Sequence, residues 1–392
     1  MISTDDQIDI YISGVGVISA AGSDLSSALI SMENGQRCAS DAGWLKSPLK
    51  GPFFDVPDIN VPTGKMRTLC LLEKALKQAL EMAALPDMTK LRVGIAMGTT
   101  VACQLNDLPF YSDYREQRHN DLSSVDTFLK GNLAEAVALM LGTHGPHVTV
   151  VNACSSGADA IGIAADWLKA GYCDVAIAGG ADELNRVSVS GFHALGVSSD
   201  KLCAPFDRDR EGLNLGEGAG VLILESRKRL HGRKDKPWLR LCGYGASNDA
   251  YHLTRPLPEG TSLKRSIQTA FDQAGVTFND IAFVNAHGTA TRENDKVEGQ
   301  VLLEYLPGVP VVSSKAYTGH TLGAAGAIEA VYSGAALLSG WIPATTGYKN
   351  KDEEILLVPT QEKTTVSKAY ALSTSIAFGG NNAALVLKRE GD

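Results

Sequence analysis

Short runs of β-branched and apolar residues alternate with stretches of helical periodicity along the whole chain. Such a run between turn residues predicts a strand, whereas apolar positions three and four residues apart predict an amphipathic helix. The predicted strands are Ile8–Ile18, Val93–Met97, His147–Val151, Val175–Ala178, Val221–Glu225, Leu239–Tyr244, Ala282–Asn285, Val309–Ser313, Ala369–Thr374 and Ala383–Leu387. The predicted helices include Asp24–Asn34, Arg67–Ala84, Asp126–Leu141, Ser155–Ala170, Ser262–Ala274 and Thr321–Ser339. This alternation predicts an α/β chain in which helices cover sheets.

Two of these helices, Ser155–Ala170 and Thr321–Ser339, carry small and apolar residues around most of their circumference. A helix without a polar face is normally buried on every side. We therefore expect both helices to lie between two sheets. The overlapping apolar run Ala324–Ala344 is interrupted by Glu329 and several glycines, so it does not predict a membrane span.

A weak internal repeat predicts two related halves. Gly216–Glu225 resembles Gly379–Lys388, 163 positions later, and Cys154 and His320, 166 positions apart, each precede an apolar helix. We expect an N-terminal half over residues 1–232 and a C-terminal half over residues 233–392. The join lies in the polar, charge-rich stretch Ser226–Pro237.

Composition and charge narrow the class of protein. The 392 residues are 44% hydrophobic and 20% charged, which excludes a disordered chain and supports a deep core. A formal charge of −8 argues against a nucleic-acid partner. Seven cysteines in a chain of this length do not indicate a disulfide scaffold. The first residues lack the basic and apolar regions of a secretory signal, so we expect a cytoplasmic protein with reduced thiols and no membrane association.

Cys154 follows the predicted strand His147–Val151 and stands where a helix begins. At that position a thiolate faces the positive end of the helix, which lowers a thiol pKa and creates a nucleophile. Unpaired backbone N–H groups at the same turn can receive an oxyanion. The alternative is a small buried cysteine without chemistry, which describes most cysteines.

Two histidines extend this candidate site. His287 comes just after the predicted strand Ala282–Asn285, before a glycine, and His320 immediately precedes the apolar helix Thr321–Ser339. Ligand-binding and catalytic residues of open α/β sheets concentrate at the carboxyl ends of strands. One such histidine is more often structural, but two of them together with Cys154 form a more specific set.

Several ordered segments carry a resemblance to a known family. They are Ile12–Ser19, the Cys154 turn, Pro205–Gly212, Leu215–Gly220, the two histidine segments and Ala377–Ala383. In order and approximate spacing they resemble the β-ketoacyl-[acyl-carrier-protein] synthases, condensing enzymes of the thiolase-like superfamily. The resemblance covers nearly the whole chain and implies an α/β, thiolase-like fold, in which two duplicated halves form a five-layered αβαβα core.

The resemblance also implies an activity, that of an acyltransferase extending fatty-acid or polyketide chains, including aryl-polyene-type chains. Such an enzyme condenses malonyl carrier protein, with loss of CO₂, with an acyl group held as a thioester on Cys154. The implied partner is an acyl carrier protein, which supplies phosphopantetheine, and the enzyme itself binds no cofactor and no metal. A homodimer and a heterodimer with a chain-length-factor-like paralogue are both open.

Residue roles follow from the same resemblance. It implies that Cys154 is the nucleophile and that His287 and His320 drive decarboxylation and stabilise the enolate. The backbone N–H groups of Cys154 and Phe378 would form an oxyanion hole, and the Phe378 ring would gate the second substrate.

Four further residues have supporting roles by this resemblance. Thr289 and Thr291 match a Thr-x-Thr that binds the phosphopantetheine arm, while Lys315 and Glu329 match a buried lysine and its acidic partner. The residue types support the second pairing, because a buried lysine or glutamate is costly unless paired. Nearby carboxylates are candidates for support of the histidines, with surface exposure as the alternative; they are Asp295 and Glu298.

The chain departs from the common family pattern at Asn152, Ala204, Ile376, Ala377 and Asn381. Alanine at position 377, where glycine is common, predicts a stiffer gating loop. These departures bear on chain length and gate motion, and they leave a secondary-metabolism synthase open as an alternative to housekeeping fatty-acid synthesis.

Other classes of protein fit less well. Gly14–Ser19 superficially resembles a dinucleotide-binding loop, the basis of an NAD-dependent oxidoreductase alternative, but it lacks the third glycine. A thiolase would bring a second cysteine near the C-terminus, whereas the last cysteine here is Cys242. A non-catalytic chain-length subunit would lack the nucleophile, so we expect this chain to be the catalytic partner.

Docking of an acidic carrier protein needs local basic residues, since the chain is acidic overall. Family positions often used for docking correspond to Lys65, Arg67 and Arg210. The densest basic stretch is Ser226–Lys236, for which a solvated linker is the more typical role.

Overall fold

A computed structural model describes residues 8–62, 65–85, 88–101, 108–118, 132–230 and 237–390 of the chain. Its main element is a continuous sheet with the strand order β3-β2-β4-β5-β1-β6-β12-β11-β7-β8. The first five strands of this order are β3 (His147–Val150), β2 (Val93–Gly98), β4 (Val175–Asp182), β5 (Gly218–Ser226) and β1 (Ile10–Ser19). The other five are β6 (Leu239–Asn248), β12 (Asn381–Lys388), β11 (Tyr370–Ile376), β7 (Ile281–Asn285) and β8 (Val311–Val312). All ten correspond to strands predicted from the hydrophobic pattern.

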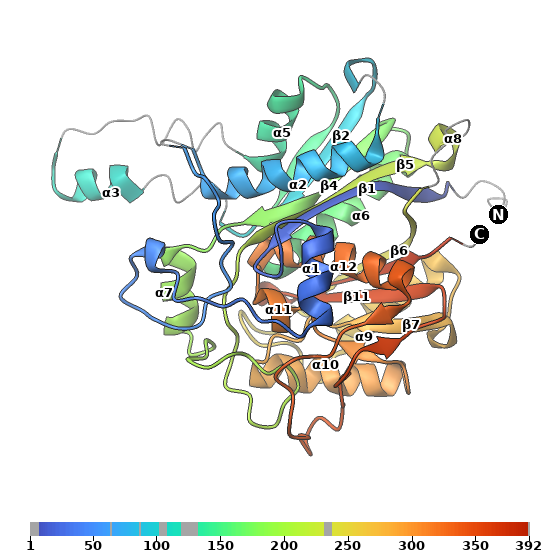
Figure 1. Cartoon of the computed structure of the whole chain (residues 1–392). Helices are drawn as coiled ribbons and strands as arrows, with labels where there is room; N and C mark the ends of the chain where they lie inside the picture. The colour runs from blue at the N-terminus through green and yellow to red at the C-terminus, as the bar shows by residue number, and fades with distance from the viewer. Residues whose placement is uncertain are drawn as a thin grey trace.

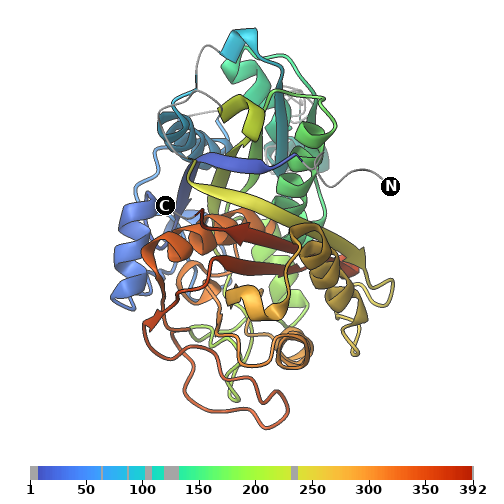
Figure 2. The same cartoon turned by 90° about the vertical axis from the view of Figure 1, so that its right-hand side faces the viewer.

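The sheet consists of two five-stranded halves with the same topology. In the first half β3, β2 and β4 run parallel, and β5 pairs antiparallel with both β4 and β1. In the second half β8, β7 and β11 run parallel, and β12 pairs antiparallel with both β11 and β6. The halves meet where β1 and β6 pair over three residues, from Ile10–Leu241 to Ile12–Leu239 (Figure 2). This repetition matches the expected α/β fold of two similar halves.

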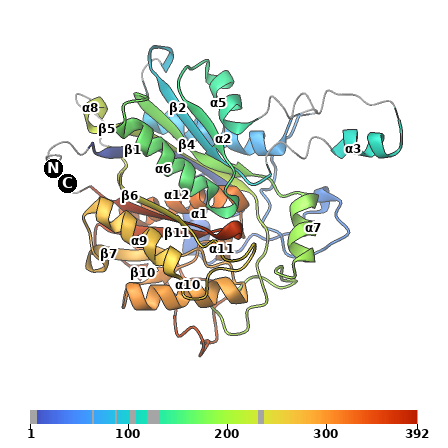
Figure 3. The same ribbon diagram turned by 180° about the vertical axis from the view of Figure 1, so that it is seen from behind.

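Helices form three layers around the two half-sheets (Figure 1). On the outer face of the first half lie α2 (Arg67–Ala83) and α5 (Leu133–Leu141), and on the outer side of the second lie α9 (Thr261–Ala274) and α10 (Arg292–Tyr305). Between the half-sheets lie α6 (Ser156–Lys169) and α12 (Ala325–Ser339), each in contact with strands of both (Figure 3). The remaining helices are α1 (Leu25–Glu33), α3 (Leu108–Arg115), α7 (Arg186–Ala194), α8 (Arg227–Leu230) and α11 (Lys315–Thr318), and two short strands, β9 (Trp341–Ile342) and β10 (Thr364–Thr365), form a separate pair. The five-layered αβαβα arrangement is confirmed.

Small residues allow the two central helices to pack closely. A Cβ on Gly157 of α6 would lie 2.9 Å from the Ala327 nitrogen, and one on Gly326 of α12 would lie 2.8 Å from the Ala158 Cβ. The segment Leu322–Ser339 has the length and mean hydropathy of a membrane span, but 89% of it is buried inside the fold. Its apolar character therefore belongs to the core.

At the two central helices, the residues that correspond between the halves differ from those predicted. A 3₁₀ turn precedes each of them, Ala153–Ser155 before α6 and Leu322–Ala324 before α12, and the first residue of each has positive φ, +48° and +54°. The structural counterpart of Cys154 is therefore Gly323, and the pairing of Cys154 with His320 was wrong by three residues. The predicted boundary at residues 232 and 233 lies outside the described residues and stays a prediction.

The glycines behind the dinucleotide-loop alternative lie inside β1. Added Cβ atoms on Gly14 and Gly16 would overlap the backbone of α2 at Ala79 and Ala75. These glycines therefore serve the close approach of a helix to a strand, and no phosphate-binding loop is formed there.

Candidate active site

Cys154 lies on a sharp turn between β3 and α6. Asn152 leaves the strand, Ala153 adopts a left-handed conformation, and the 3₁₀ turn Ala153–Ser155 runs directly into the helix. The thiol side chain is buried, with the residue 3% exposed. The sequence predicted a cysteine at the start of a buried helix, and the structure places Cys154 there.

His287 follows β7, on a loop that is held by Glu298 of α10. The Glu298 carboxylate accepts hydrogen bonds from the backbone N–H groups of His287 and Gly288, both at 2.7 Å, and from Thr374 Oγ1 at 2.8 Å. Asp295, one turn earlier, accepts from Ala290 N at 3.1 Å and from Phe206 N at 2.7 Å. Both carboxylates are buried, so the structure places them behind the histidine loop and not at the surface.

Cys154, His287 and His320 converge in one cavity. The distance from His320 Nε2 to Cys154 Sγ is 3.0 Å, and the two imidazole rings meet edge to face with centroids 5.3 Å apart. One polar atom from each of the three side chains lies within 4.8 Å of the others. The cavity they line has a volume of about 360 Å³ and is also lined by Thr289, Phe378 and other residues. Three residues from separate parts of the chain thus line one cavity.

Burial sets the protonation states at this site. The pKa values of His287 and His320 lie well below 6.5 because burial and the neighbouring Lys315 disfavour the cationic rings. Burial raises the pKa of the Cys154 thiol to about 11, against the opposing effects of Lys315 and of a hydrogen bond from the Phe378 backbone. The expectation of a lowered thiol pKa was therefore wrong for this site. Cys154 rests as a thiol beside two neutral imidazoles.

Lys315 and Glu329 form a buried ion pair beside the histidines. Lys315 Nζ also lies 3.1 Å from His287 Nδ1, so the second nitrogen of that ring faces the cavity. Burial raises the pKa of Glu329 to about 7, against the opposing effect of its pairing with Lys315. A dication bound by Cys154 and the two histidines would meet this ammonium group, so the cluster suits proton transfer better than metal binding.

Phe378 lies on the loop after β11 and stacks on Phe192 of α7, with ring centroids 5.5 Å apart. Phe192 also meets the His320 ring edge to face at 6.3 Å. Ala377 has an extended backbone, φ −115° and ψ 152°, which an alanine adopts without strain. The loop is fastened further by Asn381, whose Oδ1 accepts from Asn248 Nδ2 at 2.8 Å. Sequence reasoning missed Phe192, because a single aromatic residue in a helix gave no chemical signal.

Thr289 and Thr291 both line the cavity, and their hydroxyl oxygens are 2.9 Å apart. Arg210 holds the backbone next to them, since its guanidinium donates to the carbonyls of Thr291 and Arg292 at 3.4 and 3.0 Å. This guanidinium is buried and also pairs with Asp352 at 2.5 Å. Arg210 is therefore unavailable for docking, and its predicted docking role is corrected.

The other two predicted docking residues are also paired. The Arg67 side chain is 12% exposed, bound to the fully buried Glu217 at 2.5 Å, and stacked on the Trp44 ring at 4.0 Å. The Lys65 side chain, 35% exposed, binds Glu73 at 2.5 Å. Arg67 is thus a structural residue, whereas Lys65 keeps some exposure. Most of the basic stretch Ser226–Lys236, residues 231–236, lies outside the described residues.

Replacing Arg67 by alanine should lower the free energy of unfolding by about 3 kcal/mol, because it leaves the Glu217 carboxylate buried and unpaired. Lys65→Ala removes a partly exposed pair and should cost at most about 1 kcal/mol. Urea unfolding of the two variants and the wild-type protein measures this difference. Equal stabilities of the two variants would contradict the structural role of Arg67.

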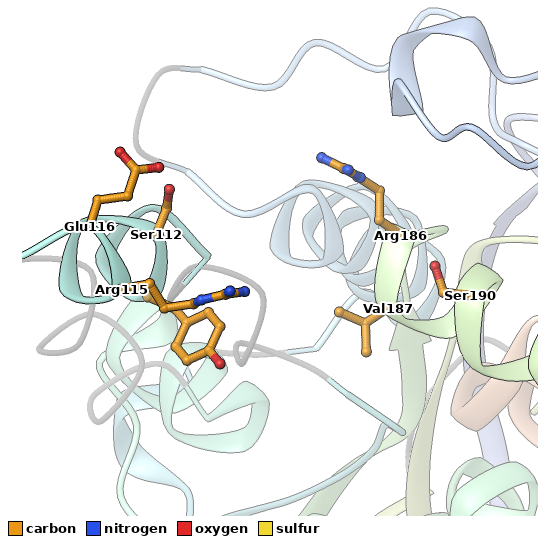
Figure 4. A pocket seen from close by; sticks show the side chains of 7 residues that line it. Ser112, Arg115, Glu116, Arg186, Val187 and Ser190 are labelled. Carbon is orange, nitrogen blue, oxygen red and sulfur yellow. The ribbon is translucent and has the colours of Figure 1, made fainter.

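A larger hollow, about 740 Å³, lies between α3 and α7. Figure 4 shows Arg115 of α3 and Arg186 and Val187 of α7 on its facing walls. None of the predicted site residues lines it. α3 lies between stretches that are outside the described residues, so we assign no function to this hollow.

Comparisons with known proteins place the chain in a family. The Beta-ketoacyl synthase N-terminal domain family matches residues 64–229, and the Beta-ketoacyl synthase C-terminal domain family matches residues 239–349. A 3-oxoacyl-[acyl-carrier-protein] synthase 2 of Rhizobium meliloti is 39% identical over 67% of this chain and 66% of its own length. Another of the same name, from Vibrio cholerae, is 36% identical over 68% of this chain and 67% of its own length. The chain thus matches about two thirds of the length of these relatives.

Solved structures match over nearly the full length. The ishigamide ketosynthase/chain length factor superposes with a TM-score of 0.92 at 29% identity, covering 98% of this chain and 100% of that one. A ketosynthase in complex with its chain length factor from Xenorhabdus doucetiae gives a TM-score of 0.84 at 29% identity, covering 100% of both chains. With both family domains matched in order and the whole fold shared, the chain belongs to the β-ketoacyl synthase family.

Proposed function

We propose that this protein is a β-ketoacyl-[acyl-carrier-protein] synthase that condenses malonyl carrier protein, with loss of CO₂, with an acyl group held on Cys154. The observation that carries the proposal is the convergence of Cys154, His287 and His320 in one buried cavity. A thiol, two neutral imidazoles and a backbone N–H beside the thiol are the groups that this reaction requires.

The first half-reaction is acyl transfer. The Cys154 thiol gives its proton to His320 Nε2, 3.0 Å away, and the sulfur attacks the carbonyl carbon of an acyl-phosphopantetheine thioester. The oxyanion that forms is stabilised by the backbone N–H groups of Cys154 and Phe378. The carrier thiolate leaves and takes up a proton, so the acyl group moves from one thioester to another. Thr289 and Thr291 would hold the phosphopantetheine arm in the cavity.

The second half-reaction is decarboxylation and carbon–carbon bond formation. The bond between the malonyl carboxylate and Cα breaks, CO₂ leaves, and the electron pair of that bond forms an enolate. The enolate oxygen accepts hydrogen bonds from N–H groups of His287 and His320. The enolate carbon then attacks the Cys154 thioester, and the Cys154 thiolate leaves as the β-ketoacyl carrier forms. Neutral rings suit this task, since each can present one N–H to the enolate oxygen.

The partners of this chain are also proposals. An acyl carrier protein would supply phosphopantetheine; one similar solved structure, 26% identical, is a type II polyketide acyl-carrier protein in complex with its ketosynthase. We propose a dimer through β3, the edge strand next to Cys154, with a second copy or with a chain-length-factor-like paralogue. The similar structures with a chain length factor support the heterodimer. A cytoplasmic location fits such a partnership.

Intact-mass analysis tests this function. Incubation of the protein with a panel of acyl-carrier thioesters should add one acyl mass, and malonyl carrier added afterwards should release CO₂ and regenerate the free enzyme. A protein that takes up no acyl group from any donor, alone or with a chain-length-factor paralogue, would contradict the proposal. A nicotinamide titration by fluorescence quenching, expected to show no binding, separates it from the oxidoreductase alternative.

A further inference from the structure

The turn that presents Cys154 has a strained backbone. Ala153 has φ +48°, a region that residues other than glycine occupy only where surrounding contacts hold them. The conformation of this residue decides where the Cys154 sulfur and backbone N–H point. Contacts that hold the turn therefore bear directly on the geometry of acyl transfer.

One carboxylate oxygen of Asp159 binds the residues on both sides of Ala153 and Cys154. Asp159 Oδ2 accepts a hydrogen bond from Asn152 Nδ2 at 2.9 Å and another from Ser155 Oγ at 2.8 Å. Asn152 immediately precedes Ala153, and Ser155 immediately follows Cys154. The carboxylate, in the first turn of α6, thus fastens both ends of the turn to the helix.

The other carboxylate oxygen connects this helix to the second half-sheet. Tyr244 on β6 donates its hydroxyl hydrogen bond to Asp159 Oδ1 at 2.9 Å. The Tyr244 ring lies against α6 at Gly162, where an added Cβ would overlap it. Asp159 is 3% exposed and therefore sealed from solvent among these partners.

The three partners are all donors, and an ionised carboxylate offers only acceptors. Burial raises the pKa of Asp159, while the hydrogen bonds from Asn152, Ser155 and Tyr244 lower it. No ion pair to Asp159 occurs within the described ranges. The donors therefore match the charged form, and hydrogen bonds to a charged group are shorter and stronger than neutral ones.

We propose that Asp159 is a positioning residue for the condensation: it holds the turn that aims the Cys154 sulfur and N–H at the acyl thioester. The substrate in this statement rests on the proposed function, whereas the contacts do not. The inference also accounts for Asn152, which stands where threonine is common in the family. Its amide supplies the N–H₂ group that reaches Asp159.

Three variants test this role. Asp159→Leu keeps the size of the side chain but leaves Asn152 and Ser155 without an acceptor, and it should slow acylation of Cys154 by about 100-fold. Asp159→Asn should stay within about threefold of wild type. Its amide oxygen can keep both donors while its N–H₂ turns to the Tyr244 hydroxyl. Tyr244→Phe, the matched control, leaves the Oδ2 contacts intact and should also acylate normally.

The readout separates positioning from general damage. Each variant is acylated to completion by long incubation, and CO₂ release is then followed after malonyl carrier is added. The rate of CO₂ release should stay within about threefold of wild type in Asp159→Leu, because His287 and His320 are held by other residues. Wild-type acylation by Asp159→Leu, or an equal fall in acylation and CO₂ release, would overturn the inference.

Two further measurements keep the test decisive. If Asp159→Leu does not fold, Asn152→Ala removes one donor only, and about tenfold slower acylation is expected; an unchanged rate overturns the inference. Alkylation of Cys154 by iodoacetamide needs no carrier and should slow about tenfold in Asp159→Leu. This result still tests the positioning role if the wild-type protein accepts no acyl carrier, the outcome that would defeat the proposed function alone.

Discussion

Replacing Cys154 by alanine should abolish acyl transfer to the protein and lower condensation by at least about 10⁴-fold. The alanine retains the turn and the cavity but has no sulfur to form the thioester, and neither imidazole is placed to replace it. The measurement is intact mass after incubation with a donor that acylates the wild-type protein, together with the rate of β-ketoacyl carrier formation. The acyl mass gain should be absent.

Cys38→Ala is the matched control for this experiment. Cys38 is an exposed free thiol, whereas Cys154 is buried beside His320. Acylation that depended on accessibility alone would occur at Cys38, so its loss in Cys38→Ala and its survival in Cys154→Ala would refute the assignment. We expect Cys38→Ala to acylate at the wild-type rate.

The hydrophobic pattern was sufficient to predict the strands and the two central helices. α6 and α12 are apolar around most of their circumference because strands of both half-sheets pack against them. α10 was missed for the opposite reason. Its buried face mixes apolar residues with Asp295 and Glu298, which hold the His287 loop, so its apolar stripe is interrupted and hard to detect.

The chemistry of the site was partly visible in the sequence. Cys154 and the two histidines stand out because reactive side chains follow predicted strands or precede helices. The pKa of Cys154 was not predictable, since the helix start argued for a lowered value and the burial that raises it is a tertiary property. The docking roles predicted for Arg67 and Arg210 were wrong for a similar reason. Arg67 looks like a surface charge until the fold brings Glu217 to it from 150 positions away.

The two histidines, equivalent in the sequence argument, should behave differently when each is replaced by alanine. His320 Nε2 lies 3.0 Å from the Cys154 sulfur, whereas His287 Nδ1 faces Lys315. His287→Ala should therefore leave acylation within about threefold of wild type and lower CO₂ release by 10²- to 10³-fold, on the order expected for loss of an oxyanion donor. His320→Ala should slow both steps by about 100-fold, because it removes a proton acceptor as well as a donor.

The rate of acylation should rise more steeply with pH in His320→Ala than in the wild-type protein. With the Cys154 pKa at about 11, the thiolate fraction without a base rises about tenfold for each pH unit between 7 and 10. Acylation by His320→Ala should rise accordingly over that range, while the wild-type protein, whose His320 takes the proton directly, should show a flatter profile. His320 Nδ1 has no hydrogen-bond partner within the described part of the chain, so neither tautomer of the ring is fixed by a second contact. The same ring can then accept the thiol proton in acylation and present an N–H to the enolate in the next step. Parallel pH profiles for wild type and His320→Ala would refute this double role and leave His320 with decarboxylation alone.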